Sequence, residues 1–286
     1  MKKTKRYQKE INIMSIKKVL ACTLAATAAF AAMSFSSCGK DDAKYVATAI
    51  ESEDNEQYGL AIGKNSTNKE AILSAMNAVI AEIDIATIIS YYDAIDSDTT
   101  PTVTLEFPDL SDNTAGTLQV YTNAEFPPFE FRDNDNNVVG ADMYIMQLVA
   151  EEMNMKVSFH DVAFNSIVAK LAVEDNAIGA AGMTIYDEPK EFVDFSDPYF
   201  STVQCIISKE DQAYSTLDQL AGKKIGVQKG TTGHIMIEDA INSGVLKDTG
   251  AQVIPYDDGP LAYNALKAGK CDVVVIDELP AKKLAR

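Results

Sequence analysis

Residues that could hold a charged ligand follow short apolar runs in this sequence. The run 177–183 ends in Gly182 and Met183 and is followed by Thr184, which predicts a strand buried on both faces, as in a parallel sheet. Asp277 follows a second apolar run in the same way. Because open α/β sheets bind ligands in a crevice at the carboxyl ends of their strands, these residues are candidates for a binding site.

A third candidate segment is KGTTG, residues 229–233, which lies between the predicted strand KIGVQ and a helix that begins near His234. Backbone amides at a helix start attract anions, so Thr231 and Thr232 are suited to a carboxylate. Each signal also has a purely structural alternative. The segment GMT could be only a strand-to-loop turn, and Asp277 could be an N-cap for the following helix.

The segments around these residues predict an α/β fold. The strands KIGVQ, AQVIPY and CDVVVI are separated by helical stretches, an alternation that implies parallel βαβ units. Further upstream, residues 117–123 predict a strand, and residues 142–153 and 164–173 predict helices.

The N-terminal block 44–95 predicts two strands and two helices. Residues 44–50 and 58–62 read as strands, and residues 85–95 as a short helix. Residues 67–70 match a capping box before an apolar stripe at helical spacing. The stripe consists of Ile72, Met76, Val79, Ile80 and Ile83.

The first 37 residues predict a secretory signal, because basic residues precede an apolar run that is too short for a membrane span. Translation from Met1 or from Met14 fits this pattern. The run ends in FSSCG, which resembles a bacterial lipoprotein cleavage box with Cys38 as the lipidated residue. We therefore expect an extracytoplasmic protein that is anchored to the cell membrane by lipid.

Several segments resemble the extracellular amino-acid-binding proteins that serve ABC importers, solute-binding protein family 3. They are AGMTIYDEP, VDFSDPYF, EFPPFEFRDNDNNVVGADMYIMQLVAEEM, LAGKKIGVQKGTTG and LKAGKCDVVVIDELPA. The resemblance implies a two-lobed, periplasmic-binding-protein-like fold of type II, in which each lobe is a mostly parallel sheet flanked by helices. It also implies capture of an amino acid for an ABC permease, with no catalysis and no cofactor.

The order of the segments differs from the family pattern. The stretch QYGLAIGKNSTNKEAILSAMNAVIAEI resembles the C-terminal end of the family, yet it comes first here, and the chain stops at ELPAKKLAR, where family members continue. We therefore expect a circular permutation. The large lobe would comprise residues 57–95 and 117–200, the small lobe 201–286 and 43–56, and the linker 96–116.

The resemblance also assigns roles in the site. Asp277 matches the aspartate that takes the ligand ammonium, Phe126 and Phe164 match the rings that sandwich the side chain, and GMT and KGTTG match the carboxylate site. The predicted ligand-binding residues are Asn123, Phe126, Phe164, Gly182, Thr184, Gln228, Thr231, Thr232 and Asp277. From sequence alone, phenylalanines in such positions are more often core residues than ligand contacts.

Two positions bear on the choice of ligand. Asn123 stands where relatives that bind basic amino acids have an aspartate, which favours a neutral or polar ligand. Pro189 stands where the family has an arginine that grips the ligand carboxylate, and Lys190 beside it is a possible substitute, although Lys is not equivalent to Arg at a bidentate site. The substrate could therefore have a different or weaker anionic end.

Composition limits the other functions. A formal net charge of −17 repels nucleic acid. With His160 and His234 as the two histidines and no cysteine cluster, a metal site is not expected. We expect a monomer, and the pairing of Cys205 with Cys271 is left open. The alternatives are an enzyme like cyclohexadienyl dehydratase, with Glu125 or Glu188 as the catalytic carboxylate, and a ligand-sensing lipoprotein.

Overall fold

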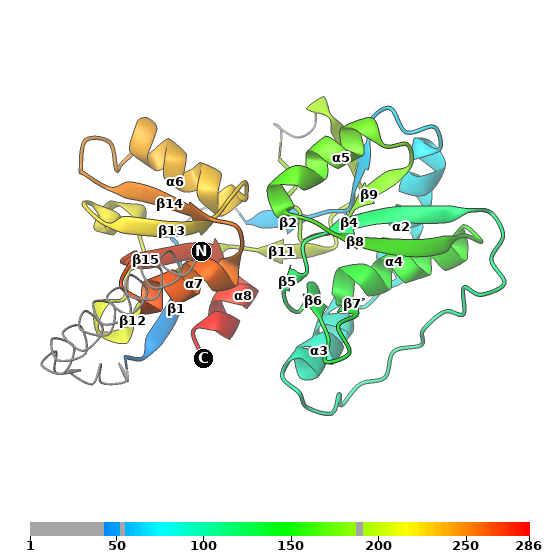
Figure 1. The fold of residues 1–286 in the computed structure, drawn as a ribbon, viewed down its shortest axis with the longest axis horizontal. Coiled ribbons are helices and arrows are strands. Elements are labelled where there is room, and N and C mark those ends of the chain that lie inside the picture. The colour runs from blue at the N-terminus through cyan, green and yellow to red at the C-terminus, as the bar shows by residue number, and fades with distance from the viewer. Residues whose placement is uncertain (1–42, 52–54, 187–190) are drawn as a thin grey trace, which may run out of the picture. The chain divides into compact units, whose positions relative to one another are not determined.

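Two five-stranded sheets form the framework of the chain (Figure 1). The computed structural model describes residues 43–51, 55–186 and 191–286. The predicted signal segment and anchor, Cys38, and the residues Glu188, Pro189 and Lys190 lie outside the described residues.

The first sheet has the strand order β1 (Tyr45–Ala49), β12 (Gln204–Lys209), β15 (Val273–Asp277), β13 (Lys224–Gln228) and β14 (Gln252–Tyr256). The strand β13 runs parallel to β14 and β15, whereas β12 runs antiparallel to β1 and β15. The helices are α6 (Thr232–Asn242), α7 (Gly259–Lys267) and α8 (Glu278–Leu284), with short 3₁₀ turns at Glu210–Gln212 and Leu217–Leu220. We call this part the small lobe.

The second sheet has the order β10 (Val193–Phe195), β3 (Ala61–Gly63), β9 (Ala177–Gly179), β4 (Thr117–Thr122) and β8 (Lys156–Asp161). Its helices are α2 (Lys69–Glu82), α3 (Ile85–Asp96), α4 (Ala141–Glu152) and α5 (Ile167–Val173), preceded by a 3₁₀ turn at Phe164–Ser166. A three-stranded sheet of β5 (Glu125–Phe126), β6 (Glu130–Arg132) and β7 (Val138–Val139) adjoins them. We call this part the large lobe.

The chain crosses between the lobes on two paired strands. The strand β2 (Glu56–Tyr58) connects β1 to β3, and β11 (Phe200–Thr202) connects β10 to β12. The two strands form an antiparallel pair. Both sheets are mixed, because β4, β8 and β9 run parallel in the large lobe whereas β3 runs antiparallel to β9 and β10.

The N-terminal block is built into both sheets. The strand β1 pairs along β12 at one edge, whereas β3 lies between β9 and β10. The single strand predicted at residues 58–62 is two strands, because the amide of Gly59 donates to the Met183 carbonyl and that of Leu60 donates to Ser196 Oγ. The chain therefore leaves its pairing with β11 after Tyr58 and pairs with β9 and β10 from Ala61 onward.

The predicted capping box at residues 67–70 is wrong. The N-cap of α2 is Asn68, and its side chain makes no capping hydrogen bond. The Thr67 amide and hydroxyl instead donate to the carboxylate of Asp175, at 2.7 and 3.0 Å. A distant loop therefore anchors the helix start, and a local pattern cannot reveal such a partner.

The core of the large lobe lies between its sheet and the helices α2 and α4. Ile72 and Met76 from the predicted stripe are fully buried there, together with Met143 and Ile145. Cys205 and Cys271 are buried free thiols, so the structure does not pair them. Among the described helices, none is by itself long and apolar enough to cross a membrane; α2 and α3 meet that criterion only together, and they are bent by 86°.

Candidate functional site

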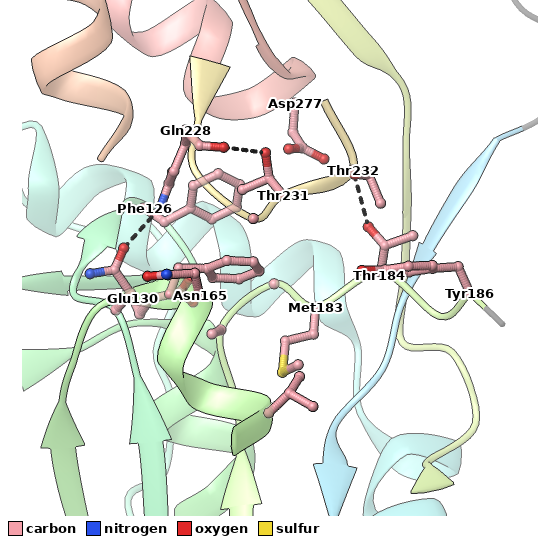
Figure 2. Close-up of a pocket in the computed structure, with 16 residues that line it drawn as sticks. Phe126, Glu130, Asn165, Met183, Thr184, Tyr186, Gln228, Thr231, Thr232 and Asp277 are labelled. Atoms are coloured by element: carbon pink, nitrogen blue, oxygen red, sulfur yellow. Dashed lines mark hydrogen bonds between the residues drawn. The ribbon is translucent and has the colours of Figure 1, made fainter. Parts of the chain in front are cut away.

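A small cavity of about 130 Å³ lies between the carboxyl-end loops of the two lobes (Figure 2). All the predicted ligand-binding residues line it: Asn123, Phe126, Phe164, Gly182, Thr184, Gln228, Thr231, Thr232 and Asp277. Met183, from the predicted GMT loop, also lines it, whereas sequence reasoning missed the remaining residues, which are Glu130, Asn165, Val168, Ala181, Tyr186 and Gly230. We call this cavity the cleft.

Asp277 is the last residue of β15, and its side chain lies in the cleft. It occupies the N-cap position of α8 but makes no side-chain capping bond. Its Oδ1 instead accepts a hydrogen bond from the Tyr58 hydroxyl at 2.7 Å. Burial, and then the nearby charge of Glu56, raises the pKa of Asp277 to about 7. The side chain thus does not serve as the helix cap that the structural alternative required, and it lines the cleft instead.

Gly182 allows a close approach of backbone to ring. It has φ +54°, and a Cβ at this position would lie 2.9 Å from Cε1 of Phe126. Its amide was expected to meet the ligand carboxylate, but it donates to Asp142 Oδ2 at 2.9 Å. Burial raises the pKa of Asp142 to about 6. The amide of Gly182, which was predicted to donate to the ligand, therefore donates to Asp142, a buried acid that sequence reasoning did not select.

The threonines of the anion site have different partners. Thr231 donates to the Gln228 carbonyl at 2.9 Å and caps α6 by accepting from the His234 amide. The hydroxyls of Thr184 and Thr232 lie 3.5 Å apart and approach each other from opposite lobes (Figure 2). Thr232 also accepts from Gln204 Nε2 at 3.2 Å. The Thr184 and Thr232 hydroxyls therefore face each other across the boundary between the lobes.

A pair of amide side chains, one from each lobe, lines the cleft. Gln228 Nε2 donates to Asn123 Oδ1 at 2.9 Å, with both residues buried. Phe126 is 7% exposed and packs against Phe129 with ring centroids 5.9 Å apart, so it belongs to the core and lines the cleft at once. Its place in the core agrees with the structural interpretation, and its contact with a ligand stays a prediction.

Glu130 is a buried acid in the wall of the cleft. It is 1% exposed, and neither carboxyl oxygen has a hydrogen-bond partner among the described residues. Burial, followed by the charges of Asp142 and Asp277, holds its pKa well above the ordinary range. It stands in the segment PPFEF, where its alternation with Phe129 and Phe131 gave no sign of a polar role.

Comparisons with known proteins identify the class. Residues 118–247 match the model of bacterial extracellular solute-binding proteins, family 3. A putative ABC transporter arginine-binding protein 2 of Escherichia coli K12 is 33% identical over 168 residues, which cover 59% of this chain and 66% of that protein. The chain thus spans slightly less than two thirds of this curated relative.

Two solved structures are also similar. An ancestral arginine-binding protein bound to arginine is 39% identical, with a TM-score of 0.54, covering 59% of this chain and 73% of that chain. An ancestral amino-acid-binding protein, a precursor of cyclohexadienyl dehydratase, is 32% identical, with a TM-score of 0.51, covering 57% of this chain and 69% of that chain.

The fold and the cleft together define a two-lobed binding protein of the type II periplasmic-binding-protein fold, as the sequence predicted. The chain belongs to the bacterial extracellular solute-binding proteins of family 3.

Proposed function

We propose that this protein captures an amino acid, or a closely related small amine, in the cleft and delivers it unchanged to an ABC permease. The observation that supports this most directly is Asp277, a buried carboxyl that lines a small cavity closed by residues of both lobes. A ligand held by both lobes stabilises their closed arrangement, which is the state that a permease could recognise.

In the proposed pose, the ligand ammonium meets Asp277 and the remainder of the molecule lies against Phe126 and Phe164. The far end offers the amides of Asn123 and Gln228, which satisfy each other and have no net charge. This arrangement favours a neutral or polar side chain over a charged one. Relatives with different ligands share the fold, so the side chain has to be identified by experiment.

The test is a thermal-shift panel of amino acids, amines and small carboxylates on the purified protein. A ligand that binds only the folded state must raise the unfolding temperature. For a compound that does so, Asp277→Ala should weaken binding at least about a hundredfold in calorimetry, because it leaves a buried ammonium unpaired. Unchanged affinity in that variant would contradict the proposed pose.

We also propose that Cys38 attaches the protein to the outer face of the cell membrane by lipid, and that the protein is a monomer. Each buried CH₂ of a lipid chain contributes about 0.8 kcal/mol to membrane binding, so more than one chain gives stable attachment. Cys38→Ala should release the protein from the membrane fraction and leave ligand binding intact. Full retention in the membrane fraction would rule out this anchor.

A second candidate is a dehydratase, which the similarity to a dehydratase precursor suggests. Such an enzyme needs a carboxyl beside its substrate. Glu125 is exposed and outside the cleft lining, whereas Glu130 is buried within it. Conversion of prephenate or arogenate by the purified protein, lost in Glu130→Gln, would support this second function and count against a receptor that performs no chemistry.

Finally, we propose that the chain is a circular permutation of the family order. The strands of the N-terminal block support this, since β1 extends the small-lobe sheet and β3 lies inside the large-lobe sheet. Residues 96–116 would then be the connection between the former termini.

A further inference from the structure

The carboxylate of Glu56 is bound in the part of the cleft that a ligand carboxylate would use. Glu56 begins the crossing strand β2. Its Oε2 accepts hydrogen bonds from the hydroxyls of Thr184 at 3.0 Å and Thr232 at 2.7 Å. These hydroxyls come from opposite lobes, and a single oxygen of Glu56 bridges them. The protein's own acid therefore stands where the α-carboxylate of an amino acid was expected.

Two other groups that were predicted to hold a carboxylate also have partners within the protein. The amide of Gly182 donates to Asp142, and the hydroxyl of Thr231 donates to a backbone carbonyl. The described residues that line the cleft include no lysine or arginine. A ligand carboxylate at this end would thus lie beside the Glu56 carboxylate, with no cation among the described residues of the lining to separate them, and repulsion between like charges disfavours this arrangement.

Two buried acids in the cleft wall favour a ligand that carries a hydrogen-bond donor or a positive charge. Glu130 and Asp277 are 1% and 5% exposed, and they come from the large and the small lobe respectively (Figure 2). Asp277 has Tyr58 as a partner, whereas both oxygens of Glu130 have none among the described residues. A buried polar group without a partner is costly, so a ligand that brings a hydrogen-bond donor or a positive charge would satisfy it.

We propose that the ligand is a primary amine without a carboxylate beside its amino group. The Glu56 carboxylate then occupies the position that the α-carboxylate of an amino acid would take. This inference rests on the proposed function, in which the cleft binds a small amine or amino acid at Asp277. The ammonium then meets Asp277, a donor group of the ligand reaches Glu130, and an apolar portion contacts Phe126 and Phe164. Such a ligand brings no carboxylate that would have to bind beside Glu56.

The experiment compares amino acids with their decarboxylated analogues. The pairs are histidine with histamine, tyrosine with tyramine, and arginine with agmatine, each titrated into the full-length protein by calorimetry at pH 7.5. We expect at least one amine to bind, and to bind about tenfold or more tightly than its parent amino acid. The agmatine arm also reports whether a second positive charge is accepted at Glu130.

Glu56→Gln is the decisive variant, because it removes the charge and keeps an oxygen for the two hydroxyls. We expect the ratio of the affinity for the amine to the affinity for its parent amino acid to fall about tenfold or to reverse. The reason is that the carboxylate of the amino acid no longer meets a negative charge at position 56. Glu125→Gln is the matched control: it removes an exposed acid of β5 outside the cleft lining, and should leave the preference unchanged. If Glu56→Gln fails to fold, Glu56→Asp serves instead, because its shorter side chain withdraws the carboxylate from the hydroxyls.

The outcomes are distinguishable. If an amino acid binds the unaltered protein more tightly than its amine, Glu56 is displaced by the ligand and the inference is wrong, while the proposed function stands. The inference is also wrong if Glu56→Gln and Glu125→Gln have the same preference as the unaltered protein. If none of the six compounds binds the unaltered protein or Glu56→Gln, the inference is overturned, whereas the proposed function is contradicted only if the wider panel of amino acids and amines also gives no binding.

Discussion

The hydroxyl of Tyr58 donates a buried 2.7 Å hydrogen bond to Asp277, although 219 positions separate the two residues in the chain. Tyr58 belongs to the crossing strand β2, and Asp277 ends β15 in the small lobe. The bond favours the charged form of Asp277, so it opposes the effect of burial on the pKa of this carboxyl.

Tyr58→Phe should therefore weaken both the fold and the site. Loss of the bond should lower the free energy of unfolding by about 1–2 kcal/mol, and it should raise the pKa of Asp277 further, so that less of the carboxyl is charged at neutral pH. Urea unfolding and calorimetry at pH 7 check the two effects. Tyr263→Phe is a control within the small lobe, because Tyr263 lies outside the cleft lining. Equal losses in the two variants would contradict a specific role for the Tyr58 hydroxyl.

Ligand binding should strengthen as the pH rises through 7. The pKa of Asp277 is raised to about 7, and an ammonium binds its charged form. Below this pKa, affinity should therefore increase up to about tenfold per pH unit, with release of a proton on binding. Titrations at pH 5.5, 6.5, 7.5 and 8.5 in buffers of different ionisation enthalpy measure this. In Asp277→Asn the binding that remains should depend less on pH, and an unchanged profile would contradict the assignment.

The same raised pKa values predict the direction for stability without ligand. Asp277 and Asp142, the latter with a pKa of about 6, hold protons more tightly in the folded than in the unfolded chain. Their contribution to the free energy of unfolding is therefore largest at low pH and decreases as the pH rises through 6 and 7. Asp142→Asn should remove its part of this dependence, which urea unfolding at pH 5 and pH 8 would measure.

Deletion of residues 44–95 should abolish folding. It removes β1 from the edge of one sheet and β3 from the interior of the other, so β9 and β10 lose their common partner. Circular dichroism and urea unfolding provide the measurement. A reordered chain, in which residues 117–286 are followed by residues 44–95, should fold and bind with unchanged affinity. If a chain that starts at Thr117 unfolds cooperatively and binds normally, the proposed permutation is wrong.

Lys283 should contribute an ion pair between the lobes that depends on salt. Its Nζ lies 2.8 Å from Asp93 and 2.6 Å from Asp96, which join α8 of the small lobe to the end of α3 in the large lobe. Its side chain is 15% exposed. Lys283→Met should lower the free energy of unfolding by about 1 kcal/mol at low salt and by less at 1 M salt.

Lys282 is a matched control for Lys283. It lies on the same helix, is 53% exposed, and pairs with Glu278 of its own helix. Lys282→Met should change stability by less than about 0.5 kcal/mol. A similar loss in both variants would show that the contact between the lobes adds nothing beyond the local helix.

The sequence predicted strands such as β13 and β15, and nine of the residues that line the cleft, because both are marked locally. Apolar runs such as 273–276 identify buried strands, and the residues that follow them lie at the same edge of each sheet. The partners of those residues could not be predicted in this way. The hydrogen bond of Gly182 to Asp142, the bonds of Thr67 before α2 to Asp175, and the bridge by Glu56 all join segments that only the tertiary fold brings together.

Glu130 was missed for a different reason. In PPFEF the acid stands between two buried phenylalanines, and alternation predicts that a charged residue in such a strand points to solvent. Its burial becomes visible only when the three-stranded sheet of β5, β6 and β7 is placed against the cleft. A single acid between two phenylalanines in an apolar segment is the sequence signal that could have indicated a buried carboxyl at this position.

The strand β2 has a consequence for the kinetics of release. Its first and last residues, Glu56 and Tyr58, hold groups on both sides of the cleft, and the same strand is one of the two connections that must bend when the lobes separate. Separation of the lobes moves Thr184 away from Thr232, and so must break at least one of the contacts that Glu56 makes. The residence time of a ligand is therefore governed in part by bonds that the ligand never touches.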